Sequence, residues 1–550
     1  MKRNHERKAT IVVVFLCVCI YIIHTYTRPV QKVGSFRSTS TKSEDVWCTS
    51  PLSQVSLWAG EPRFRTGIGQ SHLKISTRHA LAQKWFDQGL NYLHGFWHIE
   101  AYRAFQEVVR LDPQAAMGYW GIAMSQPGFA GEDRAEWLAA IEKAQILSLQ
   151  TTGLERGLIE ATKALLQKGV HAALPAFKQL VAQFPYEPEV LAFGYFFMRQ
   201  AETDIKGEAG TVLKAQFQKA LARFPEHVGL MHYYIHLLEL RPDFEEGFGV
   251  AEKMVRLAPN APHLVHMPGH LAYLKGDYAT AIEVFKAALK QEEAYHLVSK
   301  LPFSENQNYT HNLHYLAVTW AEQGDYSQAL EIAHRFASLH LPQPKLTANR
   351  LLLLYEGRML PVLVHLRFRQ WNAATNHLAQ LLQSPDAPPD ERFVQTYLLV
   401  MQAFSRGMAA VEAGQTVSAK QYLAQMTQWM QAFNEAGWGL EGKMEFQLLN
   451  ETYDIMEMAR LELLGWSENM DRSRPYNPFP FYEALRWEQR IPYDEPPRLM
   501  YPMSESLGRL HMKREEWDAA RQALSAALRQ RPNSPMIKNL LTNLQENKRP

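Results

Sequence analysis

The stretch WFDQGLNYLHGFWHIEAYRAFQEVVRLDP, residues 85–113, decides the fold of this chain. It follows the pattern W-x2-Q-G-x2-Y, then A-x3-F, then a proline, through Trp85, Gly89, Tyr92, Ala101, Phe105 and Pro113. Apolar residues recur at helical spacing here and almost everywhere beyond about residue 75, whereas strand signals are scarce. The sequence therefore predicts an all-α chain.

The same pattern returns further along the chain. A second clear copy is formed by Leu507, Gly508, Trp517, Ala520, Leu524, Ala527 and Pro532, and partial copies occur at 276–289, 324–333, 369–378 and 414–423. These segments resemble the tetratricopeptide repeat, a 34-residue helix–turn–helix unit, with only the leucine before the glycine replaced, by Gln88. The resemblance implies a helical-repeat solenoid, a right-handed superhelix, over most of residues 80–540, with poorer matches at 120–210 and 430–490.

The N-terminus predicts a membrane anchor. Four basic residues precede an apolar run from about Ala9 to Ile23, which is a charged region followed by a hydrophobic one. No small-x-small cleavage site follows, so an uncleaved single-pass anchor is favoured over a cleaved signal peptide and a secreted protein. The positive-inside bias places the main domain outside the cytoplasm, in the periplasm if the source is bacterial.

These signals divide the chain into six predicted parts. They are a cytoplasmic basic stub (1–8), a transmembrane signal-anchor (9–26), a tether (27–74), N-terminal repeats (75–225), histidine-rich repeats (226–340) and C-terminal repeats (341–550).

Composition and net charge limit the partners and metal ligands that can be expected. The 58 basic and 56 acidic residues leave a net charge of +2, so no global field favours nucleic acid, and no nucleic-acid partner is expected. Of the three cysteines, Cys17 and Cys19 lie in the apolar run, so Cys48 cannot form a disulfide framework or a cysteine zinc finger. Histidine is the only nitrogen ligand for a soft metal that is present in quantity.

Histidines concentrate on one face of three successive repeats. In the tetratricopeptide family, positions 2, 5, 9 and 12 of the first helix face the concave groove, and the consensus residues start the three units at Val228, Pro262 and Thr310. Seven of the twelve groove positions are then histidine, where about half a residue is expected by chance. They are His232, His236, His263, His266, His270, His311 and His314, joined by Glu239 and Tyr273.

This pattern predicts a metal centre in the groove. Neutral imidazole suits copper, zinc and iron, with copper or zinc favoured here. Because seven histidines and Glu239 exceed one tetrahedral shell, either some are outer-shell residues or two ions bind. Six histidines would suit paired copper, and three with a carboxylate would suit zinc or iron. Glu239 and Tyr273 are the candidate catalytic groups.

We expect Pro268 to kink its helix and so to change the direction in which the neighbouring histidines point.

Residues 228–326 also resemble a largely uncharacterised, mostly bacterial subgroup of tetratricopeptide proteins. The shared motifs are H-x3-H-x2-E, H-x2-HMP-[SG]-H and a later H-N pair, with YDEPP at 493–497. Within YDEPP, Glu495 could reach the groove, although a rigid linker is the favoured interpretation.

Three functions stay open from the sequence. The first is a membrane-anchored metalloprotein, with a metal-dependent oxidase or hydrolase as its candidate activity. Because no familiar catalytic signature occurs, catalysis would come from the metal. The second is a non-catalytic scaffold that binds a peptide or protein in the groove, which is the common role of such arrays. The third is metal storage or delivery.

Overall fold

The computed structural model describes residues 62–125, 134–299, 301–340, 353–383, 392–436, 444–471, 473–491, 495–498 and 501–546. The chain separates into two units, 1–53 and 54–550, and all the described residues belong to the second. These residues form helices and no strand. The predicted all-α class is therefore confirmed for this part of the chain.

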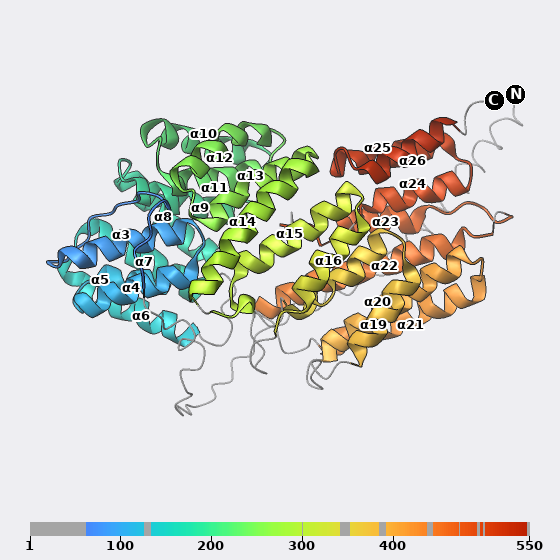
Figure 1. Cartoon of the computed structure of the whole chain (residues 1–550), viewed down its shortest axis with the longest axis horizontal. Coiled ribbons are helices and arrows are strands. Elements are labelled where there is room, and N and C mark those ends of the chain that lie inside the picture. The colour runs from blue at the N-terminus through green and yellow to red at the C-terminus, as the bar shows by residue number, and fades with distance from the viewer. Residues whose placement is uncertain are drawn as a thin grey trace, which may run out of the picture. The chain divides into compact units, whose positions relative to one another are not determined.

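Successive helices pack as pairs, and each pair packs on the next, as the colour gradient of Figure 1 shows. The pairs are α3 (Ala80–His94) and α4 (His98–Leu111), α5 (Ala116–Met124) and α6 (Arg134–Leu147), α7 (Gly153–Lys168) and α8 (Val170–Gln183), α9 (Pro188–Ala201) and α10 (Glu208–Arg223), α11 (Val228–Leu238) and α12 (Gly247–Leu257), α13 (Pro262–Lys275) and α14 (Tyr278–Ser299), α15 (Gln307–Gln323) and α16 (Tyr326–Ala337), α18 (Leu360–Arg367) and α19 (Trp371–Leu382), α20 (Arg392–Glu412) and α21 (Thr416–Ala436), α22 (Met444–Glu468) and α23 (Phe479–Glu488), and α24 (Met503–Lys513) and α25 (Trp517–Gln530), followed by α26 (Pro535–Glu546). Short helical turns occur at Ser148–Gln150, Phe244–Glu246, Phe303–Glu305 and Leu353–Gly357.

The consensus glycines let the two helices of a pair approach closely. A Cβ on Gly89 would lie 2.6 Å from the ring of Phe105, and one on Gly269 would lie 2.5 Å from the ring of Phe285. Real Cβ atoms essentially never lie so close to another heavy atom. The small residue expected at position 269 is therefore required by helix packing.

Helix α13 lies where the two large hydrophobic cores meet. It contributes Leu264, Met267 and Leu271 to the N-terminal core and Ala272 and Tyr273 to the C-terminal core. Because both of its sides are held by apolar contacts, its histidines are presented from a rigid helix.

The structure bears on two expectations about local conformation. Helix α13 continues past Pro268, which lacks the amide that would bond the carbonyl of Leu264, and the expected kink there stays a prediction. The predicted tether is also too long, because Ile68, Leu73 and Ile75 are buried in the N-terminal core. Leu73 and Ile75 pack inward two residues apart, and the amides of Ser71 and Ile75 donate to Asn91 and Gln83 of α3.

The predicted anchor at 9–26 lies outside the described residues and stays a prediction. Among the residues that the structure does describe, no helix is both long enough and apolar enough to cross a membrane.

Candidate metal centre

Three first helices carry the predicted histidines. Helix α11 carries His232 and His236, helix α13 carries three, and helix α15 carries His311 and His314. Both α11 and α15 contact α13. The structure brings together six of the seven histidines, with neighbouring ring centroids 4.5 to 6.2 Å apart.

The first group of three is formed by His232, His236 and His263. The Nε2 atoms of His236 and His263 each lie 3.0 Å from Nε2 of His232. Imidazole nitrogens bound to one tetrahedral ion at about 2.0 Å would lie roughly 3.3 Å apart. The three nitrogens thus converge with nearly the spacing of a single metal site. We call these residues triad 1.

The second group, triad 2, is formed by His266, His270 and His311, with one nitrogen of each within 4.8 Å of the others. The Nε2 atoms of His266 and His270 are buried and have no hydrogen-bond partner among the described residues. A buried polar nitrogen without a partner is costly unless something binds it. His311 is the most exposed of the six rings.

Outer acceptors fix which nitrogen carries hydrogen in four of the six rings. Nδ1 of His232 donates to the carbonyl of His94 at 2.6 Å, and Nδ1 of His266 donates to Oδ1 of Asn312 at 2.9 Å. Glu239 accepts from Nδ1 of His270 at 2.9 Å and from Nδ1 of His236 at 3.2 Å. With Nδ1 protonated, a neutral ring presents only a lone pair at Nε2.

Glu239 therefore joins the two triads through the outer nitrogens of their rings. It was predicted as a ligand and a catalytic group, but both its oxygens are engaged by Nδ1 atoms. Glu495 adds a second carboxylate, with one oxygen 3.5 Å from Nδ1 of His236 and 3.7 Å from Nδ1 of His270. These four residues could also hold an ion, but an outer carboxylate that orients a ligating imidazole is the commoner arrangement.

Electrostatics separate His236 from the other five. Burial opposes its charge, yet Glu239 and Glu495 raise the pKa of His236 to about 9. Burial lowers the pKa of His270 to about 3. Burial, with repulsion from neighbouring histidines, also lowers the pKa values of the remaining four, which are His232, His263, His266 and His311. At neutral pH five rings are thus neutral, and a proton on Nε2 of His236 separates the facing lone pairs of triad 1.

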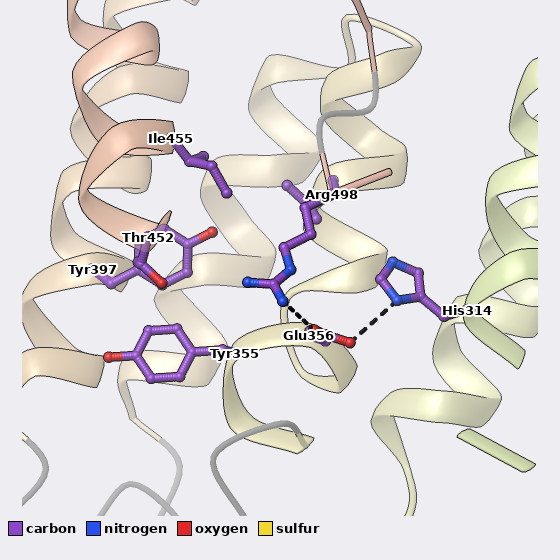
Figure 2. Close-up of a pocket in the computed structure, with 8 residues that line it drawn as sticks. His314, Tyr355, Glu356, Tyr397, Thr452, Ile455 and Arg498 are labelled. Carbon is purple, nitrogen blue, oxygen red and sulfur yellow. Dashed lines mark ion pairs between the residues drawn. The ribbon is translucent and has the colours of Figure 1, made fainter. Parts of the chain in front are cut away.

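His314 does not join the other histidines, although it was predicted as a ligand. It belongs to neither triad, and its Nδ1 lies 3.3 Å from the carboxylate of Glu356. It is three residues after His311 and so starts from nearly the same face of α15, but its ring turns toward Glu356 (Figure 2).

Tyr273 also lies apart from the candidate ligands. Its ring packs against Tyr278 and Tyr315, and its buried hydroxyl has no hydrogen-bond partner in the part of the chain that the structure describes. Burial raises its pKa to about 12. The expectation that it shares the histidine face is not supported by these contacts, because they place it in the C-terminal core.

A buried network from the first repeats supports triad 1. Both oxygens of Glu189 are engaged by histidines, Nε2 of His94 at 2.6 Å and Nε2 of His227 at 2.9 Å, and Nδ1 of His94 lies 3.1 Å from the hydroxyl of Tyr233. His94, Glu189 and His227 could also hold a metal ion. Every ring nitrogen of these two histidines, however, already has a protein partner. The network holds His94, whose carbonyl orients His232.

Phe96 covers triad 1 from the loop before α4. Its ring centroid lies 4.6 Å from that of His232 and 5.0 Å from that of His263. Its φ of 49° is in the left-handed region, which is unusual for an aromatic residue. The strain is consistent with a loop held in place by its contacts to the site.

Sequence reasoning missed the outer-shell residues. Helical register cannot identify Glu189, Glu356 or Phe96, because they come from distant repeats and loops. Glu495 was noticed in the YDEPP motif but interpreted as part of a linker.

The fold and site define an all-helical repeat protein of paired helices with a buried polyhistidine cluster. Residues 505–543 match the family model of the tetratricopeptide repeat. The chain thus carries a tetratricopeptide repeat in its C-terminal region, and the predicted resemblance to this superfamily is confirmed. The bacterial subgroup stays a prediction.

Among curated proteins, none is significantly similar in sequence to this chain. Matches to solved structures include a human IFIT1 dimer with m7Gppp-AAAA, at 13% identity and a TM-score of 0.31, covering 84% of this chain and 94% of that one. They also include the P58(IPK) TPR domain, at 13% identity and a TM-score of 0.18, covering 86% and 100% of the two chains. At such scores, no ligand or partner is transferred to this chain.

Proposed function

We propose that the protein is a metalloprotein whose six clustered histidines hold two transition-metal ions, one in each triad. The observation that carries this proposal is the convergence of the three Nε2 atoms of triad 1 at 3.0 Å while their outer nitrogens are engaged or buried. Neutral rings in this arrangement would point lone pairs at one another. A proton on one Nε2 relieves part of that repulsion, and a metal ion bound by all three nitrogens relieves it fully.

The donor set favours copper. Six imidazole donors, with Glu239 and Glu495 placed at Nδ1 atoms, disfavour magnesium, calcium and manganese, which prefer oxygen ligands. Among divalent first-row ions, nitrogen sites bind copper most tightly. Zinc is the second choice, because three histidines also form catalytic zinc sites.

We assign the pair of ions to oxidation chemistry with dioxygen. Two adjacent copper ions can supply two electrons, which a zinc pair cannot. Five of the six ligands are buried and the sixth, His311, is partly exposed, so access to triad 2 comes from the side of His311. Burial of the other rings argues against a storage or delivery site, which must exchange its metal.

Elemental analysis tests this proposal. The full chain, purified without a histidine tag and incubated with copper, zinc and iron separately, is expected to retain copper in preference to the others. Substitution of His232→Ala together with His266→Ala is expected to remove the metal. A folded wild-type protein that retains none of these ions would overturn the proposal and favour a non-catalytic scaffold that binds a peptide or protein.

We also propose, from the sequence alone, that residues 9–26 anchor the protein in a membrane with the repeats outside the cytoplasm. Extraction of membranes with alkaline carbonate tests the anchor, and protease added to intact cells or spheroplasts tests the side. Release of the protein by carbonate would contradict the membrane anchor. Protection of the repeats from protease would contradict their location outside the cytoplasm.

A further inference from the structure

The ring of Phe96 covers triad 1 and leaves triad 2 uncovered. Its centroid lies 4.6 Å from that of His232, 5.0 Å from that of His263 and 5.8 Å from that of His236. Of the six clustered histidines, all of which the structure describes, it packs against these three only. The loop between α3 and α4 thus places an apolar ring on one flank of triad 1.

The ring of Tyr315 covers triad 2 in the same way. Its centroid lies 4.3 Å from that of His270, 5.1 Å from that of His311 and 6.3 Å from that of His266. In the described structure it packs against no ring of triad 1. Because Tyr315 follows His311 by four residues on α15, the helix that supplies a ligand also supplies this covering ring.

The two triads cover each other on the remaining flank. Between ring centroids, His263 lies 4.5 Å from His266, and His236 lies 6.0 Å from His270. The rings therefore follow one another in the order Phe96, triad 1, triad 2 and Tyr315. Each triad has an aromatic side chain on one flank and the other triad on the second, so water is kept from both flanks.

The spacing of the rings fits ions with three ligands and no water. Ring centroids within triad 1 are 4.7, 4.8 and 6.1 Å apart, and those within triad 2 are 4.5, 5.0 and 5.6 Å apart. An imidazole that binds an ion at about 2.0 Å holds its centroid roughly 3.2 Å away, so four rings around a tetrahedral ion would lie roughly 5.2 Å apart. The distances from Phe96 and Tyr315 scatter around this value. Each covering ring thus stands at the distance of a fourth ligand.

The charge of the cluster favours monovalent ions. The described carboxylates that contact the six rings are Glu239 and Glu495. With all six imidazoles neutral, these two balance two monovalent ions, whereas two divalent ions would leave two positive charges uncompensated in a buried site. Arg199 donates to the carbonyl of His236 at 3.4 Å and so adds to that excess.

We propose that both triads hold copper as copper(I), three-coordinate and without bound water. Zinc held by three histidines takes a water or substrate as its fourth ligand, and copper(II) prefers a square-planar or tetragonal shell. Copper(I) is satisfied by three imidazoles and carries a single charge. Phe96 and Tyr315 thereby select the metal and its oxidation state. Copper(I) at these positions rests on the proposed function, in which each triad holds an ion.

X-ray absorption at the copper edge tests this state in the full chain, loaded with copper and ascorbate without oxygen and then freed of ascorbate. We expect two copper(I) ions per chain, each with three nitrogen neighbours and no oxygen neighbour. Phe96→Gly removes one covering ring without backbone strain, because glycine readily adopts the φ of 49° found there. Water then reaches triad 1, so zinc should bind that triad at least about tenfold more tightly than in wild type.

Three further variants are controls for the loss of the ring. Phe96→Tyr and Tyr315→Phe each keep a covering ring and should leave the zinc affinity unchanged, as should Phe64→Ala, which removes an exposed phenyl ring elsewhere. An oxygen neighbour or copper(II) in wild type, or equal zinc affinity in Phe96→Gly and wild type, would overturn copper(I) selection and leave the metalloprotein standing. Wild-type protein that holds no metal would overturn both.

Discussion

At the scale of single residues, the cluster depends on which ring nitrogen each histidine turns inward. The sequence predicted the six residues of the triads, because a helical face follows directly from spacing. It could not predict that the oxygens of Glu239 would accept from the Nδ1 atoms of His236 and His270, because that depends on side-chain rotation. For the same reason it misplaced His314, whose partner Glu356 is brought in by another helix.

The raised pKa of His236 predicts a pH-dependent metal affinity. Its proton must leave before Nε2 can bind an ion, so protons compete with metal below the pKa of about 9. Affinity is therefore expected to rise with pH, by about tenfold per unit for one proton, and to level off near pH 9. Competition titrations between pH 6 and pH 10 with a chelator of known affinity measure this. Affinity that is flat across that interval would contradict the assigned protonation.

Removal of the shared carboxylate should weaken metal binding at both triads. Glu239→Leu leaves Nδ1 of His236 and His270 without their acceptor, and outer-shell losses of this kind cost about 10- to 100-fold in affinity. Glu245→Leu, at an exposed carboxylate near α12, is the control. An effect on one ion only, or none, would show that Glu239 does not orient both rings.

At the scale of helices, the consensus residues predicted where the helices begin more closely than how the connecting segments pack. Helices α11 and α13 begin at the predicted residues, Val228 and Pro262, and α15 begins at Gln307, three residues before the predicted Thr310. The contact between a consensus glycine and an aromatic ring makes the helix positions predictable, because it fixes which faces of the two helices meet. The segment 62–75 has no such marker, so its packing against α3 was not foreseen.

Gly269→Ala is expected to destabilise the protein by about 1–3 kcal/mol, because its Cβ would overlap the ring of Phe285. Gly249→Ala in α12 is the matched control: nothing lies within 4 Å of its Cβ, so alanine should stabilise by up to about 1 kcal/mol. Urea unfolding of both variants measures the difference. Equal effects of the same sign would contradict the close packing of α13 on α14. Phe285→Leu added to Gly269→Ala should recover part of the loss.

At the scale of the whole molecule, a buried ion-pair network joins the central helices to the C-terminal repeat. Arg367 of α18 lies 3.3 Å from Glu322 of α15 and 3.0 Å from Glu505 of α24. All three side chains are almost completely buried. Contacts between residues so far apart in the sequence cannot be read from a repeat pattern, which specifies neighbours only.

Arg367→Met should destabilise the protein strongly. It would remove the shared guanidinium and leave each buried carboxylate with one other arginine, Glu505 with Arg509 at 2.9 Å and Glu322 with Arg531 at 3.4 Å. We expect a loss of about 1.5–3 kcal/mol. Arg369→Met breaks a much more exposed pair with Glu412 and should cost no more than about 1 kcal/mol. Chemical denaturation compares the two. A loss below about 1 kcal/mol for Arg367→Met would mean that the network does not hold the C-terminal repeat.

The central claim is that two separate histidine triads each hold one ion, and site-resolved metal stoichiometry tests it most directly. Copper per folded chain would be measured for wild type, His263→Ala in triad 1, His311→Ala in triad 2, the combination of both, and His314→Ala as the control outside the triads. We predict two ions in wild type, one in each single variant, none in the combination and two in His314→Ala. A single ion in wild type that either substitution removes, or a loss in His314→Ala equal to that in His311→Ala, would contradict the claim.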